Sequence, residues 1–358
     1  MNCPAMVPVS SKTDMLDKDQ KLAIYMEQNL DTDYGKMGFG IMRFSSNPIV
    51  CVIDSRHAGK TVNQVDRLPF HYPVVSNVDE AVKLGAEVLV LGIAPSGGRL
   101  PREWQVPLNR AIELDMCLIN GLHDNLNDEF GHHLNDKQWI WDVRQPAFTP
   151  DIATARAASL KNKRVLLVGT DMAIGKMTAG LEIYHWMRSR HPELKTEFLA
   201  TGQIGITLAG KGIPLDAFKV DHACGAVETM VLEAADNDVV LIEGQGSLLH
   251  PGSTATLPLM RGSCATHLVM CHLAGMTCLR KPESISIPPL REFIQLNEEL
   301  SAACGSLPKA ETVGIALNTA LVDEKEAASE IHRLEDETGL PVTDVVRFGA
   351  EKLGETLV

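Results

Sequence analysis

The chain lacks the features that would assign it to several common classes of protein. It has no apolar run of roughly 18 residues, as a membrane-spanning helix requires, and no charged start followed by an apolar stretch, as in a secretory leader. It also has no long basic run, and its net charge is −13, which argues against nucleic acid and anionic membranes as partners. An anionic small molecule stays compatible with this charge, because a few local lysines or arginines are enough to bind one.

The eight cysteines lack the density of a disulfide scaffold, and no Cys-x-x-Cys pair is present. Cys264, Cys271 and Cys278 recur every seven residues, but Cys271 falls in an apolar stretch where cysteine acts as a small hydrophobe. We therefore expect reduced thiols in a cytoplasmic protein, with no bound metal.

Three common catalytic signatures are also missing. The chain contains no Gly-x-Ser-x-Gly, no His-Glu-x-x-His, and no Gly-x-Gly-x-x-Gly after its first predicted strand. These absences weaken the interpretations as a serine hydrolase, a zinc peptidase or a nicotinamide-dependent dehydrogenase. The 358 residues, 45% of them hydrophobic, are nevertheless enough for two domains with real cores.

Short apolar runs alternate with helix-forming stretches, which predicts parallel strands connected by helices. In the first part of the chain we expect strands at Ile49–Ile53, Val88–Ile93 and Met116–Ile119, and helices at Asp79–Leu84 and Glu103–Leu114.

Residues 145–160 predict a domain boundary, because the proline-containing stretch 145–150 breaks regular structure and a short Ala-rich helix is expected after it. We expect a Rossmann-like parallel-sheet domain over residues 1–150 and a P-loop NTPase-like α/β domain over residues 151–358. The strands expected in the second domain are Val165–Val168, Glu197–Thr201, Val239–Glu243, Thr266–Cys271 and Thr312–Leu317.

Residues 164–180 have the pattern of a strand, a phosphate-binding loop and a helix start. Consecutive backbone N–H groups and the helix N-terminus favour an anion there, and Lys176 adds a full charge. The usual pattern has Ser or Thr directly after this lysine, because the hydroxyl ligates Mg²⁺. Here that position is Met177, and Thr178 comes one residue late. The loop is suited to a pyrophosphate and poorly equipped for Mg²⁺.

Ligands of open parallel sheets bind beyond the carboxyl ends of the strands, so polar residues at strand ends are candidate site residues. Glu243 ends one predicted strand and precedes Gly244 and Gly246, which permit close ligand approach. It is a candidate general base. Asn318 ends another strand, where we expect contact with a purine ring.

Three strand ends of the first domain also carry polar residues. Asp54 ends the first predicted strand, and His57 and Lys60 lie on the loop beyond it. Ser96 and Arg99 follow the next strand, and Asn120 and His123 follow the third. Because these strand ends converge on one edge of a parallel sheet, we expect a site there.

Three stretches taken together resemble a single family. They are residues 54–61 (Asp-Ser-Arg-His-Ala-Gly-Lys-Thr), 169–178 (Gly-Thr-Asp-Met-Ala-Ile-Gly-Lys-Met-Thr) and 243–252 (Glu-Gly-Gln-Gly-Ser-Leu-Leu-His-Pro-Gly). The resemblance is to the two-domain P-loop family of D-glutamate N-acetyltransferases, formerly of unknown function, and it spans nearly the whole chain. It implies transfer of acetyl from acetyl-CoA to the amine of a D-amino acid, above all D-glutamate, in D-amino-acid catabolism.

On this resemblance we infer the roles of individual residues. CoA carries a pyrophosphate and a purine nucleotide, so we expect it on the phosphate loop and its surroundings, at Gly169, Thr170, Asp171, Gly175, Lys176, Thr178 and Asn318. We expect the base that deprotonates the substrate ammonium to be Glu243 or Asp54, with His57 in reserve. Substrate binding is expected from Lys60, Ser96, Arg99, Gln245, Arg280 and Lys281.

Two other functions stay open. The opening Gly-Thr-Asp of the loop also resembles dethiobiotin synthetase, which has Thr at the position of Met177. An ATP- and Mg²⁺-dependent ligase or kinase would recover its metal site from Thr178 or Asp171 together with Glu243. The third possibility is a non-catalytic protein that senses a nucleotide or CoA. In each case we expect small-molecule ligands and a homo-oligomer.

Overall fold

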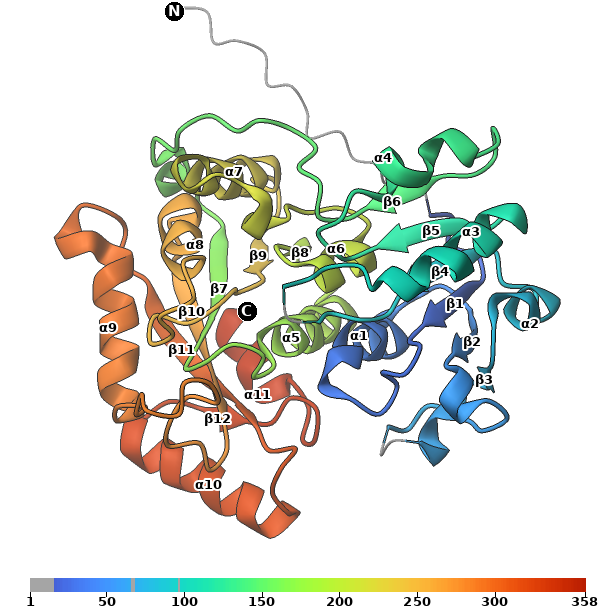
Figure 1. Cartoon of the computed structure of the whole chain (residues 1–358). Helices are drawn as coiled ribbons and strands as arrows, with labels where there is room; N and C mark the ends of the chain where they lie inside the picture. Colours follow the sequence, from blue (N-terminus) through green and yellow to red (C-terminus); the bar gives the residue numbers. More distant parts are fainter. Residues whose placement is uncertain (1–15, 66–67, 96) are drawn as a thin grey trace, which may run out of the picture. The chain divides into compact units, whose positions relative to one another are not determined.

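The computed structural model describes residues 16–65, 68–95 and 97–358, which form two compact units. One unit ends at Ala147 and also includes Ile206–Ala217; the other comprises Phe148–Gly205 and Phe218–Val358. Each unit contains one six-stranded sheet with helices around it (Figure 1). The predicted α/β class of both units is confirmed. The predicted substrate-binding residue Ser96 lies outside the described residues.

In the first unit the strand order is β3-β2-β1-β4-β5-β6, and neighbouring strands are parallel throughout. The strands are β1 (Leu22–Tyr25), β2 (Ile49–Ile53), β3 (Val74–Val75), β4 (Val88–Leu91), β5 (Cys117–Asn120) and β6 (Ile140–Asp142). The helices are α1 (Lys36–Phe44), α2 (Val78–Lys83), α3 (Gln105–Glu113) and α4 (Leu126–Phe130).

Strand β1 lies at the centre of this sheet, and its alternating side chains enter two different layers. Tyr25 packs edge-on against Trp104, with ring centroids 4.5 Å apart, in the core that α2, α3 and α4 cover. Ile24 faces α1, where a Cβ at Gly38 would lie 3.1 Å from Cγ2 of Ile24. Glycine at this position therefore lets α1 approach the sheet closely.

In the second unit the strand order is β12-β11-β10-β7-β9-β8, again with parallel neighbours throughout. The strands are β7 (Lys163–Gly169), β8 (Thr196–Leu199), β9 (Val239–Ile242), β10 (His267–Leu273), β11 (Glu311–Asn318) and β12 (Val342–Thr343). The helices are α5 (Lys176–Arg190), α7 (Val220–Glu233), α8 (Thr256–Ser263), α9 (Leu290–Ala302), α10 (Glu324–Thr338) and α11 (Glu351–Gly354). Helix α6 (Gln203–Ala209) follows β8, and its residues from Ile206 onward belong to the first unit.

Helix α5 packs against β7 and β8, and α7 packs against α8 on β7 (Figure 1). A Cβ at Gly180 of α5 would lie 2.8 Å from Cε2 of Phe198, so glycine again allows a close helix–sheet contact. None of the described helices has the length and apolar character needed to cross a bilayer.

Five of the six strands in the second unit match predicted strands to within a few residues. Strands β1, β3, β6 and β12 are additions to the prediction. Strands β3, β6 and β12 have two or three residues each, so their apolar runs are too short to give a periodic signal. Strand β1 has four residues, as many as the predicted strand β9, and was missed. The predicted Ala-rich helix after the boundary is a single 3-10 turn, Arg156–Ser159.

Candidate active site

The phosphate loop connects β7 to α5, as the sequence predicts. Gly175 caps α5 with a φ of 110°, a left-handed conformation that a side chain would strain. A Cβ at Gly169 would lie 3.1 Å from the carbonyl oxygen of Cys271 on the neighbouring strand. The two glycines therefore let the backbone turn tightly into the helix. The helix N-terminus presents unsatisfied N–H groups and partial positive charge to an anion.

Lys176 is buried in the first turn of α5 with its Nζ atom 2.7 Å from the carbonyl oxygen of Asp171. Burial lowers the pKa of this ammonium to about 8, although the charge of Cys271, Asp171 and Glu243 opposes the shift. This bond ties the lysine side chain to the backbone of the phosphate loop. An anion on the loop would add opposite charge beside the buried ammonium.

Asp171 uses both carboxylate oxygens to brace the phosphate loop. Oδ1 accepts the N–H of Met172 at 2.6 Å, and Oδ2 accepts the N–H of Arg280 at 2.9 Å. The second bond ties the loop to the segment that follows β10. Asp171 therefore holds the shape of the loop, and the Arg280 backbone is brought to the same place.

Thr170 is fully buried and is held from two sides. Its Oγ1 lies 2.9 Å from Nδ1 of His272, and its carbonyl oxygen accepts the hydroxyl of Ser247 at 3.0 Å. Burial lowers the pKa of His272 to about 4, so this imidazole is neutral at physiological pH. The sequence analysis did not single out His272, which is a fixed support for the loop.

Glu243 lies immediately after β9 and is 4% exposed. Its Oε2 accepts the N–H groups of Thr201 and Gly202 at 2.8 and 3.0 Å, and Gln245 donates a further side-chain hydrogen bond. Burial nevertheless raises its pKa to about 7, because the hydrogen bonds and Lys176 only partly offset the desolvation of the carboxylate. The group is thus poised to gain or lose a proton near neutral pH.

The close approach of Glu243 to the phosphate loop depends on Gly244. A Cβ there would lie 1.6 Å from the carbonyl oxygen of Leu167, so no other residue fits without moving a strand. Gly244 therefore allows close packing against β7, and its role in close ligand approach stays a prediction.

The other predicted residues of this unit lie around the same loop, with different degrees of involvement. Asn318 donates its amide to the carbonyl oxygen of Ile174 at 3.1 Å, and Thr178 is half-buried in the first turn of α5. Arg280 and Lys281 are exposed beyond β10. The carbonyl oxygen of Lys281 accepts Nε2–H of His250 at 2.6 Å, which fixes that turn.

In the first unit, Asp54 and His57 meet at the carboxyl end of β2. Asp54 has no exposed surface; its Oδ1 accepts the N–H of Arg56 at 3.0 Å and its Oδ2 accepts the N–H of Leu30 at 3.2 Å. Nδ1 of His57 lies 3.3 Å from the same Oδ2. The buried carboxylate therefore holds the imidazole in one orientation, with Nδ1–H donating to it.

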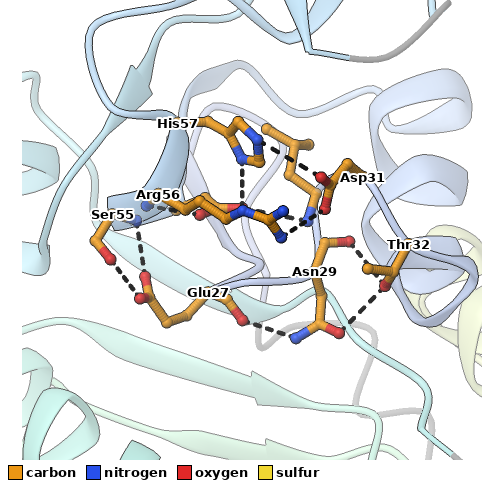
Figure 2. Close-up of polar contacts among 9 residues, drawn as sticks. Glu27, Asn29, Asp31, Thr32, Ser55, Arg56 and His57 are labelled. Atoms are coloured by element: carbon orange, nitrogen blue, oxygen red, sulfur yellow. Dashed lines mark hydrogen bonds and ion pairs between the residues drawn. The ribbon is translucent and has the colours of Figure 1, made fainter.

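The opposite nitrogen of His57 faces Asp31, a residue that the sequence analysis missed (Figure 2). Nε2 lies 3.6 Å from Oδ2 of Asp31, whose side chain is 30% exposed and also pairs with Arg56 at 3.4 Å. The nearby Glu27 accepts the N–H of Ser55 at 2.8 Å. Asp31 and Glu27 follow β1, so a prediction of that strand would have marked them as strand-end candidates.

The remaining predicted residues of the first unit are less constrained. Lys60 is exposed on the loop after His57, and Arg99 pairs with Asp124 at 3.2 Å on the surface. Two backbone N–H groups that could otherwise stabilise an oxyanion, one in each unit, already donate to other acceptors. The N–H of Gly98 donates to Pro95 at 3.0 Å, and that of Ser247 donates to the Ser253 hydroxyl at 3.1 Å.

Each unit thus offers a different capability. The second has a loop that fits a phosphate or diphosphate, with a buried ammonium and a carboxyl group that titrates near neutrality. The first has an oriented imidazole between two carboxylates. Within the described ranges, no three His, Cys, Asp or Glu side chains gather as a metal site would require.

Comparisons with known proteins agree with this division. The P-loop domain model of DUF1611, a domain of unknown function, matches residues 151–354. The Rossmann-like DUF1611_N model matches residues 55–146. The Rossmann-like and P-loop character predicted for the two domains is confirmed. A crystal structure of a DUF1611 family protein from Anabaena variabilis is 44% identical, with a TM-score of 0.91, and covers 95% of this chain and 99% of that one.

Two relatives are described as D-glutamate N-acetyltransferase. The protein from a Pseudoalteromonas species is 35% identical over 285 residues, which is 77% of this chain and 83% of its own length. The protein from Tritonibacter scottomollicae is 35% identical over 284 residues, or 78% and 84% of the two lengths. The resemblance stated from the three sequence stretches is therefore confirmed.

Proposed function

This chain belongs to the DUF1611 family, and we propose that it transfers an acetyl group from acetyl-CoA to the amino group of D-glutamate. The observation that carries the proposal is the 35% identity, over 77–78% of the chain, to two proteins described as D-glutamate N-acetyltransferase. The amine nitrogen attacks the thioester carbon, the carbon–sulfur bond breaks, and CoA leaves as a thiol. The protein must remove a proton from the substrate ammonium, because only the neutral amine is nucleophilic.

We assign the phosphate loop to the diphosphate of CoA. The N-terminus of α5 and the ammonium of Lys176 supply the positive charge. Both carboxylate oxygens of Asp171 accept backbone N–H groups, so neither is free of a partner. Met177 has a thioether where a Mg²⁺ site has a hydroxyl. In this proposal the loop binds the diphosphate of CoA through positive charge and backbone N–H groups, so no Mg²⁺ ligand is needed.

The assignment of CoA to this loop has a consequence for the catalytic base. Glu243 lies beside Lys176, at the diphosphate end of the ligand. The thioester is at the far end of the pantetheine arm. Glu243 therefore has the role of setting the charge around Lys176. We favour His57 as the base, because the buried Asp54 orients its imidazole. Asp54 has no exposed surface and orients His57, so it does not contact the substrate.

In this proposal the ammonium of D-glutamate lies against Asp31, whose partly exposed carboxylate faces Nε2 of His57. The imidazole takes the proton at Nε2, and the buried Asp54 stabilises the imidazolium that forms. Lys60, Arg99, Arg280, Lys281 and Gln245 are the candidates of the sequence analysis for the two substrate carboxylates. The exposed cations among them suit long-range attraction of a dianion.

An ATP- and Mg²⁺-dependent ligase or kinase is the second candidate. The observation in its favour is that Glu243 follows β9 beside the phosphate-loop lysine, where nucleotide enzymes place an acidic residue that orients a metal or a water. The engaged oxygens of Asp171 and the thioether of Met177 weigh against it.

One set of assays on the purified protein separates the candidates. We expect thiol release from acetyl-CoA that requires D-glutamate and continues in excess chelator. Release of ADP from ATP that requires Mg²⁺, with no consumption of thioester, would establish the ligase or kinase instead. Tight binding of CoA without turnover of any amino acid would indicate the sensing protein.

A further inference from the structure

Arg144 lies just after β6 in the first unit and is held by one of its two terminal nitrogens. Nη1 lies 2.7 Å from Nε2 of His123 and 2.5 Å from Oδ2 of Asp216. The side chain is only 12% exposed. Its Nε is buried and has no hydrogen-bond partner within residues 16–65, 68–95 and 97–358.

The unpartnered Nε is unusual, because a buried donor on a charged group costs free energy when it is left without an acceptor. Both hydrogen bonds of the guanidinium leave from Nη1, so the edge formed by Nε and Nη2 is the part that is not used. That edge has the spacing of a carboxylate, which it binds through two parallel hydrogen bonds. The chemistry of the unused edge therefore selects a carboxylate as its partner.

The surroundings of Arg144 keep the guanidinium in place. Nε2 of His123 accepts from Nη1, which requires a neutral imidazole, and burial together with the charge of Arg144 lowers the pKa of His123. Asp216 is half exposed and contacts Nη1 alone, so it offsets the charge without covering the other edge.

The position in the fold is that of a ligand site. Strands β4, β5 and β6 are neighbours in the parallel sheet, and Gly98, His123 and Arg144 follow them in that order. The carbonyl oxygen of Gly98 accepts the N–H of His123 at 2.7 Å. A Cβ at Gly98 would lie 2.3 Å from Cδ2 of His123, so glycine allows this loop to pack onto the ring. Ligands of such sheets bind at this carboxyl edge.

We propose that Arg144 binds a carboxylate of the amino-acid substrate through its Nε and Nη2 edge. The inference rests on the proposed function and adds a specificity-determining residue to it. Arg144 thereby favours an acidic amino acid, while His123 and Asp216 hold its guanidinium. The sequence analysis assigned this role to exposed cations such as Arg99 and did not consider Arg144.

The test is equilibrium binding by the full chain, measured calorimetrically with D-glutamate and with glutarate, each with and without saturating CoA. Arg144→Lys keeps the positive charge but cannot form the bidentate pair of hydrogen bonds. We expect both ligands to bind about 10- to 100-fold more weakly. Arg110→Lys is the matched control, because Arg110 is exposed on α3 and pairs with Asp79 and Glu113. We expect it to bind like the wild type.

Unchanged affinity in Arg144→Lys, or no binding of either ligand by the wild type, would overturn the inference. If the variant does not fold, the wild type still provides a test: D-glutamate and glutarate should protect Arg144, and not Arg110, from modification by phenylglyoxal. Absence of that protection also overturns it. Binding of glutarate through Arg144 by a protein that does not acetylate D-glutamate would retain this inference and reject the proposed function.

Discussion

Nδ1 of His57 lies 3.3 Å from Oδ2 of Asp54, a carboxylate with no exposed surface. A buried acid that accepts from one imidazole nitrogen leaves the other nitrogen as the one that exchanges protons. In this chain the other nitrogen faces Asp31 at 3.6 Å, next to solvent. This arrangement is the basis for choosing His57 over Glu243 and Asp54 as the general base.

Replacing His57 by Gln should lower kcat for D-glutamate acetylation by about 10²- to 10⁴-fold, the usual contribution of a general base. The affinity for CoA should not change, since the phosphate loop is in the other unit. Steady-state kinetics and CoA titration measure the two quantities. His133→Gln is the matched control, because His133 is exposed. Full kcat in His57→Gln would exclude the histidine as the base.

Replacing Lys176 by Met should weaken CoA binding by about 10- to 100-fold, since a charged hydrogen bond to phosphate is lost. The fold should persist, because burial already disfavours the ammonium of Lys176. Calorimetry with CoA and thermal unfolding provide the two measurements, with the exposed Lys325→Met as the control. Equal CoA affinity in Lys176→Met and the wild type would place the diphosphate elsewhere.

CoA binding should weaken as pH rises from about 6 to 9, for two reasons with the same sign. Glu243, with a pKa raised to about 7, acquires negative charge beside the diphosphate, and Lys176, with a pKa lowered to about 8, loses its positive charge. Titrations across this range in the wild type and in Glu243→Gln measure the effect. The variant should lose the decrease near pH 7 and keep the one near pH 8. An affinity that rises with pH contradicts the assignment.

The same carboxyl group should make stability depend on pH. A folded-state pKa above the value of about 4.3 in an unfolded chain means that the folded protein binds the proton more tightly. Stability from this group is therefore fully present below about pH 4.3 and is lost as pH rises through about 7. Comparing the thermal midpoints of the wild type and Glu243→Gln at pH 5.5 and 8 isolates it. The thermal midpoint of the variant should rise relative to that of the wild type at pH 8. An equal difference between the two midpoints at both pH values would contradict the raised pKa of Glu243.

Arg164 should be a stability determinant, because its buried guanidinium pairs with no carboxylate in the described part of the chain and donates to carbonyl oxygens instead. Nε and Nη2 donate to Cys264, and Nη1 donates to Leu160 and Asn162, at 2.9–3.1 Å. Arg164→Lys supplies too few donors and should lower the thermal midpoint by roughly 5–10 °C. Arg333→Lys, on the surface of α10, should shift it little. A similar midpoint in both variants would show that these bonds contribute little.

The sequence was sufficient for features that are local in the chain. The phosphate loop follows from residues 164–180, and most strands of the second unit follow from apolar runs of ordinary length. Strand β1, Leu22–Tyr25, was missed although it is as long as the predicted strand β9, and Asp31 was missed with it. The contact of Asp31 with His57 joins two loops of the folded sheet, so no spacing in the chain predicts it.

Differences in burial distinguish the candidate bases, which the sequence alone did not. Asp54, Glu243 and His57 are all strand-end groups by their positions, but only the structure places Asp54 wholly in the interior and Glu243 beside Lys176. The unpartnered Nε of Arg144 likewise depends on which acceptors the folded chain brings near it. Exposure and the pairing of donors are tertiary properties, and residue type alone does not determine them.

The most direct test of the account is to incubate the purified protein with D-glutamate and isotopically labelled acetyl-CoA and to analyse the product by mass spectrometry. The account predicts label in an amide on the nitrogen of D-glutamate, one CoA thiol released for each amide formed, and no requirement for Mg²⁺ or ATP. Labelled acetyl-CoA that stays intact in the presence of D-glutamate, while ATP is cleaved with Mg²⁺, would contradict it.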